Sequence, residues 1–244
     1  TPGGGVGATD IMDSELQRFR ARTGKPVVAY LMETSAGGGY YLATGCDLII
    51  AQPAAVVGGI GVLLNLYNLR DTMAQLNVFS QPIRAGEHID MGSSIRELTP
   101  QERQWLQQMA DEFHKRFIGV VLGRRKAVAA DEPTNFDGRV FTAAEAQRRG
   151  LVDRLGYMDD AIAAATALAD GRAGAAHTDV LQRWQVVMFR RPDDPARSPY
   201  AMTPNTPLQG RWLPVSVPGL ERSRLPTFLY MWQIEPTLER AGGQ

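Results

Sequence analysis

The chain has 244 residues, of which 44% are hydrophobic and 21% are charged, which is typical of a globular protein and enough for one sizeable α/β domain. Lysine plus arginine and aspartate plus glutamate both number 26, so the net charge of zero gives no field that favours nucleic acid or an anionic membrane as a partner. Cys46 is the single cysteine, which excludes an intrachain disulfide.

The first part of the chain alternates short apolar segments with helical stretches. A glycine-rich start at 1–9 leads into a helix predicted over 10–21, and Lys25-Pro26 opens a strand predicted over 27–32. Residues 34–43 indicate a tight turn into a short buried helix. Three further strands and one helix are predicted, the strands over 48–51, 60–64 and 78–84 and the helix over 67–76. Strands separated by helices are typical of parallel βαβ units.

A long amphipathic helix is predicted over 99–123. Its start is well marked, because Thr99 can cap the helix, Pro100 takes the first position and Glu102 completes a capping box. Five side chains at a spacing of three to four residues are expected to face the core: Trp105, Met109, Phe113, Phe117 and Val120.

Two shorter helices, one capped by Thr142 and one over 158–169, close the periodic part of the chain. Nine of the fifteen prolines lie in residues 171–244. We therefore predict a compact domain at 1–170 and a Pro-rich, irregular C-terminal extension at 171–244, which lies on the domain or reaches a partner.

No apolar run reaches the ~18 to 20 residues that a membrane-spanning helix needs. No signal peptide opens the chain, which begins directly at Thr1-Pro2-Gly3-Gly4 before a strand-to-helix turn. We expect that sequence upstream of Thr1 is missing, and that any membrane association depends on an anchor in that sequence.

Five motifs occur in a fixed order over residues 1–170, and together they resemble the signal peptide peptidase (protease IV) family. The family patterns are S-P-G-G, K-P-V-V-A, G-G-Y-Y-I-A, G-S-I-G-V and G-R-V-Y-T followed by G-L-V-D. The matching segments here are Thr1-Pro2-Gly3-Gly4, Lys25-Pro26-Val27-Val28-Ala29, Gly38-Gly39-Tyr40-Tyr41-Leu42-Ala43, Gly58-Gly59-Ile60-Gly61-Val62, and Arg139-Val140-Phe141-Thr142 with Gly150-Leu151-Val152-Asp153. The resemblance implies a serine peptidase of the ClpP/crotonase fold class, an α/β βαβ spiral with a parallel sheet.

The resemblance also locates the family's catalytic positions, and both are changed. The pattern A-A-S-G-G-Y-Y puts Gly37 in the place of the serine nucleophile, and the segment that carries the lysine base puts Ile89 in its place. Gly59 replaces the serine of G-S-I-G-V. Peptide hydrolysis by a Ser–Lys pair needs a hydroxyl that attacks and a neutral amine that takes the proton. Glycine and isoleucine supply neither, so the sequence predicts a degenerate site.

The backbone part of the site is expected to persist. The family pattern implies oxyanion and substrate-binding N–H groups at Gly3 and Gly4 in the first turn and at Gly38 after the nucleophile position. A relocated catalytic pair also stays open, with Ser35 as substitute nucleophile and His88 as its general base.

Three functions follow as alternatives. The first is a non-catalytic member that binds an extended peptide or signal-peptide remnant and forms a homo-oligomer or assembles with a homologous active chain. The second is an active peptidase that uses Ser35 or residues from a partner chain. The third is crotonase-type acyl-thioester chemistry at the same oxyanion hole, for which the sequence offers no nucleotide motif. No metal, cofactor or nucleic acid is expected in any of them, and the resemblance implies a membrane-associated protein.

Overall fold

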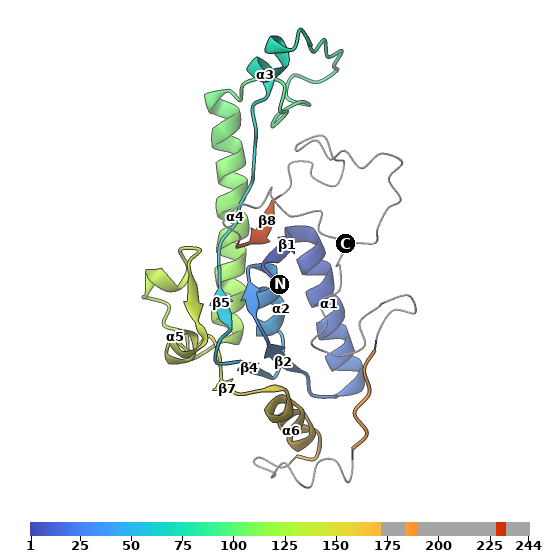
Figure 1. Ribbon diagram of the computed structural model, residues 1–244, viewed down its shortest axis with the longest axis vertical. Helices are drawn as coiled ribbons and strands as arrows, with labels where there is room; N and C mark the ends of the chain where they lie inside the picture. Colours follow the sequence, from blue (N-terminus) through green and yellow to red (C-terminus); the bar gives the residue numbers. More distant parts are fainter. Residues whose placement is uncertain (172–183, 190–227, 233–244) are drawn as a thin grey trace.

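The computed structural model describes residues 1–171, 184–189 and 228–232. Within this part of the chain, short strands form small sheets that are flanked by helices, and one long helix runs along the side of the molecule (Figure 1). The predicted α/β class is confirmed. The predicted division at residue 170 stays a prediction, since most of 171–244 lies outside the described residues.

Most strand pairing in the body of the domain is parallel. One sheet has the order β2-β4-β7, with both pairs parallel, from Val28–Leu31, Leu48–Ala51 and Arg154–Leu155. A second sheet pairs β3 parallel to β5, and β5 antiparallel to β6, from Thr34–Ala36, Val56–Gly58 and Val140–Thr142. The strands predicted over 27–32 and 48–51 are thus confirmed, as is the parallel arrangement.

The described helices flank these sheets, except for one that lies away from them at the top of Figure 1. They are α1 (Val6–Thr23), α2 (Gly38–Thr44), α3 (Arg70–Gln75), α4 (Pro100–Arg124), α5 (Ala143–Arg148) and α6 (Met158–Ala169), with a short 3₁₀ turn at Pro133–Asn135. The capping box at the start of α4 is confirmed, because the Glu102 amide donates to Thr99 Oγ1 at 3.2 Å and the Thr99 amide donates to Glu102 Oε2 at 3.0 Å. Thr142 caps α5 as predicted.

Four predictions in the first hundred residues need correction. The strand over 60–64 is wrong, since β5 ends at Gly58 and only an isolated bridge at Leu63 follows. The strand over 78–84 is also wrong, and the Ile83 side chain there is fully exposed, so the segment has no apolar surface to pack against. The helix predicted over 67–76 is shorter (α3), and the helix predicted over 10–21 starts earlier, at Val6.

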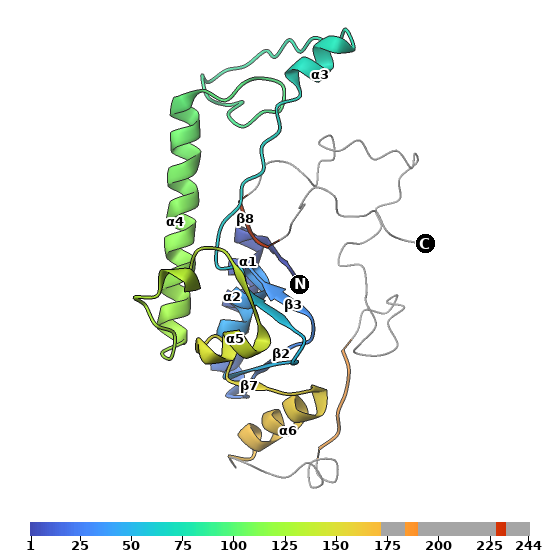
Figure 2. The same cartoon turned by 60° about the vertical axis from the view of Figure 1, so that its left-hand side comes forward.

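The core lies where α2 and the C-terminal half of α4 pack on the strands. Tyr41 from α2 lies against Phe117 from α4, with ring centroids 5.1 Å apart and both side chains buried. Phe113 and Val120 pack against this core, as predicted. Met109 is 40% exposed instead, because the N-terminal half of α4 extends beyond the sheets (Figure 2).

Residues 65–98, which we call the arm, project along the N-terminal end of α4 and carry α3 at their tip (Figures 1 and 2). An ionic cluster joins the arm to the helix. Arg96 donates to Glu102 Oε1 at 2.6 Å and to Asp90 Oδ1 at 2.9 Å. The Arg96 guanidinium holds the pKa of the buried Glu102 carboxyl well below its usual range, so this carboxylate stays charged.

Candidate functional site

The turn at Gly37 joins β3 to α2 and has a conformation that suits only glycine. Its φ of +52° and ψ of −124° lie outside the regions that other residues adopt without strain. The Gly37 amide donates to Gly58 O at 3.0 Å, and its carbonyl accepts from the Tyr41 amide at 2.9 Å. A sharp strand-to-helix turn of this kind is how a nucleophile is exposed at the end of a strand in the α/β hydrolases. Here the turn carries no side chain.

The first residues of the chain lie beside this turn, as the sequence predicts. The strand β1 (Gly3–Gly5) leads into α1, and the Ala36 amide donates to Thr1 O at 3.1 Å. A Cβ placed on Gly38 would lie 3.4 Å from the Gly4 amide nitrogen, so the two backbones are in close contact. The structure therefore brings Gly3, Gly4 and Gly38 together beside Gly37, and the role of the first three as substrate-binding donors stays a prediction.

The space between residues 1–5 and 37–41, which we call the groove, is occupied. The strand β8 (Leu229–Met231) pairs antiparallel with β1, in the register Gly3 with Met231, Gly4 with Tyr230 and Gly5 with Leu229. Residues 228–232 of the extension thus lie on the domain. The run Phe228-Leu229-Tyr230-Met231-Trp232, five apolar residues in a Pro-rich region, was the signal for a buried strand that the sequence analysis missed.

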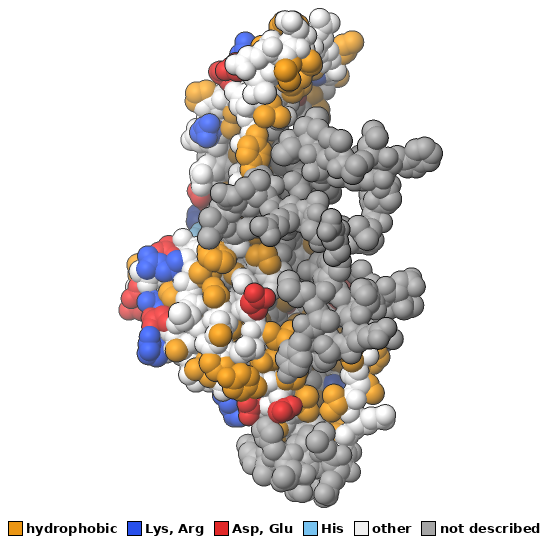
Figure 3. Space-filling view, viewed as in Figure 1, with side chains coloured by type: hydrophobic (Ala, Val, Ile, Leu, Met, Phe, Trp, Pro, Cys, Tyr) orange, Lys and Arg blue, Asp and Glu red, His pale blue; other side chains and the backbone are white. Residues whose placement is uncertain are grey.

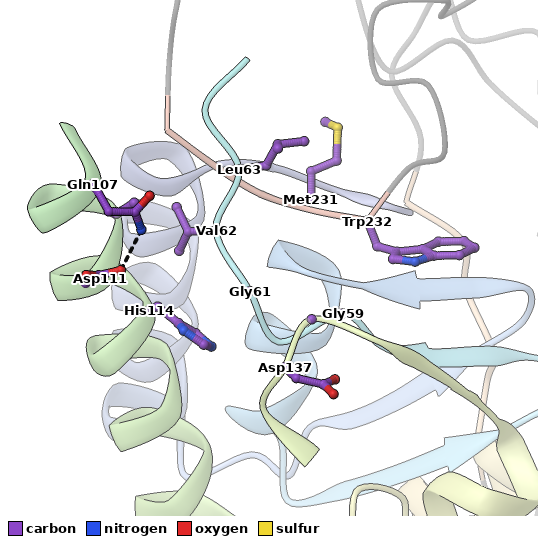
Figure 4. A pocket seen from close by; sticks show the side chains of 12 residues that line it. Gly59, Gly61, Val62, Leu63, Gln107, Asp111, His114, Asp137, Met231 and Trp232 are labelled. Carbon is purple, nitrogen blue, oxygen red and sulfur yellow. Dashed lines mark hydrogen bonds between the residues drawn. The ribbon is translucent and has the colours of Figure 1, made fainter. Parts of the chain in front are cut away.

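A pocket of about 340 Å³ adjoins the groove and opens between α4 and residues 59–63 (Figure 4). Met231 and Trp232 line it from one side and His114 from the other. His114 Nε2 lies 3.0 Å from Ile60 O, and Asp137, also in the lining, pairs with Arg139 at 2.6 Å. These polar side chains are already engaged by their own neighbours.

The candidate pair Ser35 and His88 is not brought together within the chain. Ser35 is buried in β3, in register with Val57 of β5. His88 lies on the arm, where its Nδ1 is 3.4 Å from Glu102 Oε1 and its ring packs edge-on against Trp105 with centroids 4.8 Å apart. The arm and β3 lie in different parts of the molecule (Figure 2).

Ile89 also lies on the arm, and its side chain is 72% exposed. It does not line the groove, which lies beside the middle of α4 (Figure 1). Within one chain, the two positions that the family pattern assigns to catalysis, Gly37 and Ile89, are therefore apart.

Other chemistry finds little support in the residues that the structure describes. No three His, Cys, Asp or Glu side chains among them are grouped so that they could hold a metal ion. Burial raises the pKa of the Cys46 thiol to about 11, which leaves it protonated and unreactive at neutral pH. None of the described helices combines the length and the hydropathy that crossing a bilayer requires.

The chain is similar to known peptidases. A family model described as Peptidase family S49 matches residues 20–172. Protease 4 of Salmonella typhi is 32% identical over 204 residues, which cover 84% of this chain and 32% of the relative. A putative signal peptide peptidase SppA of Enterococcus faecium is 28% identical over 162 residues, which cover 66% of this chain and 47% of the relative. The chain thus spans about a third of the first relative's length and about half of the second's.

Solved structures of enoyl-CoA hydratases are also similar to this chain. A probable enoyl-CoA hydratase/isomerase from Mycobacterium abscessus has a TM-score of 0.36 at 18% identity and covers 71% of this chain and 48% of its own. The enoyl-CoA hydratase from Thermoplasma volcanium has a TM-score of 0.35 at 24% identity and covers 70% and 49%. A likeness at this level says nothing about activity.

Proposed function

This chain belongs to peptidase family S49, and from that premise we propose that it is a non-catalytic member of the family that binds extended peptides. The observation that carries the proposal is the turn at Gly37. It is a sharp strand-to-helix turn with a positive φ, and it offers no hydroxyl to attack a peptide bond.

The missing groups argue against hydrolysis. Removing the serine nucleophile of a serine protease lowers kcat by a factor on the order of 10⁶. Ser35 is a poor substitute, because it is buried in β3 before the turn and has no described base beside it. Misplacing a reacting group by even ~1 Å can lower a rate a hundredfold.

The backbone around the turn supports peptide binding. An extended peptide binds by adding a strand to an exposed edge, with main-chain hydrogen bonds for affinity and pockets for alternate side chains. The edge of β1 accepts β8 in this way, so an extended main chain fits between Gly4 and the turn at Gly37. None of these contacts needs a nucleophile.

We expect no specific peptidase activity from the purified chain. Casein and an unfolded signal peptide would be the substrates, with product formation followed by mass spectrometry. The variants Ser35→Ala and His88→Ala are expected to match the wild-type chain at background. Turnover by the wild type that Ser35→Ala abolishes would overturn the proposal and would assign the nucleophile to Ser35.

Assembly is the second part of the proposal. The arm carries several large apolar side chains in water: Leu76 is 71% exposed, Phe79 72% and Ile83 fully exposed. Figure 3 shows hydrophobic side chains on the arm at the top of the view. Exposed apolar surface of this kind is typical of a protein–protein contact. We propose that the arm packs against a second copy of this chain or a homologous chain.

Replacing Phe79 and Ile83 together by serine is expected to weaken self-association at least about tenfold, since burying each such side chain contributes ~1.5–3 kcal/mol. Sedimentation velocity across micromolar concentrations would measure it. Ile11→Ser, at an α1 side chain that is 66% exposed, is the matched control. A wild-type chain that stays monomeric throughout would contradict packing against a second copy, and an equal effect of Ile11→Ser would contradict the role of the arm.

A further inference from the structure

The segment Phe228–Trp232 is held on both sides like a strand added to a sheet. On one side it pairs with β1, and the pairing continues where the Trp232 amide donates to Pro2 O at 2.8 Å and the Val6 amide to Phe228 O at 3.1 Å. On the other side the amides of Leu63 and Leu229 each donate to the other's carbonyl at 2.9 Å. Addition of a strand to a sheet edge through main-chain hydrogen bonds is one of the ways in which proteins bind extended peptides.

The main chain of this segment passes so close to two glycines, Gly37 and Gly3, that any side chain at these positions would collide with it. A Cβ on Gly37 would lie 2.5 Å from the Tyr230 carbonyl carbon and 2.7 Å from the Met231 nitrogen, and it would overlap the Tyr230 carbonyl oxygen. A Cβ on Gly3 would lie 2.8 Å from the Tyr230 carbonyl carbon. The peptide unit between Tyr230 and Met231 therefore rests directly against the turn where the family pattern has its nucleophile.

A third glycine makes room for the end of the segment. A Cβ on Gly59 would lie 2.9 Å from Trp232 Cβ, and Gly59 itself has a φ of +60°. At Gly37 and Gly59 this chain has glycine where the family pattern that it resembles has serine. Both replacements thus remove side-chain atoms from the path of the same segment.

The Tyr230 side chain supplies the specific contact. It is 1% exposed, its ring stacks on Tyr41 with centroids 5.4 Å apart, and it meets Phe117 at 4.7 Å. The hydroxyl donates to Phe113 O at 2.9 Å. Burial raises the pKa of this phenol to about 12, so the hydroxyl remains a donor at neutral pH.

We infer that the groove selects extended peptides that place a tyrosine in the pocket formed by Tyr41, Phe117 and the Phe113 carbonyl, and that Phe228–Trp232 is the chain's own occupant, which a competing peptide must displace. The inference rests on the proposed peptide-binding function and adds the class of ligand to it. A tyrosine fits because its ring packs against two aromatic rings and its buried hydroxyl finds an acceptor in the Phe113 carbonyl.

The test uses the full chain and a fluorescent peptide with the sequence of residues 226–234. Fluorescence anisotropy would compare the wild-type chain with Tyr230→Ala, which weakens the resident strand, and with Tyr157→Ala, a control at a tyrosine that is 59% exposed. We expect Tyr230→Ala to bind the peptide at least about tenfold more tightly than the other two, because aromatic pairing and burial of a ring together exceed ~1.4 kcal/mol.

Peptide variants separate this inference from the proposed function. Replacing the central tyrosine of the peptide by alanine or leucine is expected to weaken binding to Tyr230→Ala at least about tenfold. Equal binding of all three peptides would overturn the tyrosine preference and leave peptide binding intact. Binding of none of them would overturn both. Equal affinity of the wild type and Tyr230→Ala would show that the segment does not compete.

If Tyr230→Ala does not fold, hydrogen exchange on the wild-type chain tests whether a tyrosine peptide displaces residues 228–232. Excess tyrosine peptide is expected to raise exchange at the amides of 228–232, and the alanine peptide is not. Unchanged exchange would overturn the inference. Protection of 228–232 that falls on dilution would assign the occupant to a second copy and overturn occupancy by the same chain.

Discussion

Replacing Phe117 by alanine is expected to destabilise the chain by ~3–5 kcal/mol, the range for a fully buried aromatic side chain. Phe117 is 0% exposed and lies between two other rings, 5.1 Å from Tyr41 and 4.7 Å from Tyr230. Its removal therefore leaves a cavity at the point where α2, α4 and β8 meet. Urea denaturation followed by circular dichroism would measure the change in the free energy of unfolding.

The same helix offers a matched control for this prediction. Met109→Ala removes an apolar side chain that is 40% exposed, and it is expected to change the free energy of unfolding by less than ~1 kcal/mol. A double-mutant cycle of Phe117→Ala with Tyr230→Ala should give a coupling of ~0.5–1.5 kcal/mol, as for an aromatic pair in contact. Additive effects would mean that β8 is not packed on this core in solution, which would contradict the structure.

The sequence predicted correctly those helices and strands whose bounds depend on residues close together in the chain. The capping box of Thr99 and Glu102 placed the start of α4 correctly, and the apolar run 48–51 gave β4 with its bounds. The strand predicted over 78–84 is wrong because a strand depends on a partner that is distant in the sequence. Its β-branched and aromatic residues favour a strand, but a strand forms only where a partner edge is available, and in the described part of the chain this segment lies on an exposed arm.

The candidate site also has parts that the sequence predicted and parts that depend on distant residues. The sequence pattern located the turn at Gly37 and its neighbours Gly4 and Gly38, because these depend on contiguous motifs. The occupant of the groove depends on pairing between β1 and residues more than two hundred positions later, which no periodicity in the sequence encodes. The exposure of Ile89 depends on the path of the arm, which the motif around it does not specify.

Restoring a serine at position 37 is expected to open the groove without restoring peptidase activity. In Gly37→Ser the backbone at a φ of +52° becomes strained, which costs ~1–3 kcal/mol. The new Cβ also collides with backbone atoms of Tyr230 and Met231, which cannot rotate away as a side chain could. The segment 228–232 should leave the groove, and the free energy of unfolding should fall by at least the ~1–3 kcal/mol of strain. Hydrogen exchange at 228–232 and urea denaturation would measure the two effects.

Gly7→Ser is the matched control for Gly37→Ser. A Cβ on Gly7 meets nothing within 4 Å, and the residue lies exposed in the first turn of α1, so exchange at 228–232 should stay as in the wild type. The restored hydroxyl lacks a base, because the position assigned to the lysine is Ile89 on the exposed arm. Unchanged protection of 228–232 in Gly37→Ser would show that the segment does not rest against the turn. Peptide turnover by the single variant Gly37→Ser would show that a base reaches position 37 from elsewhere in the chain or from a second copy. The non-catalytic site would then differ from an active one by this single side chain.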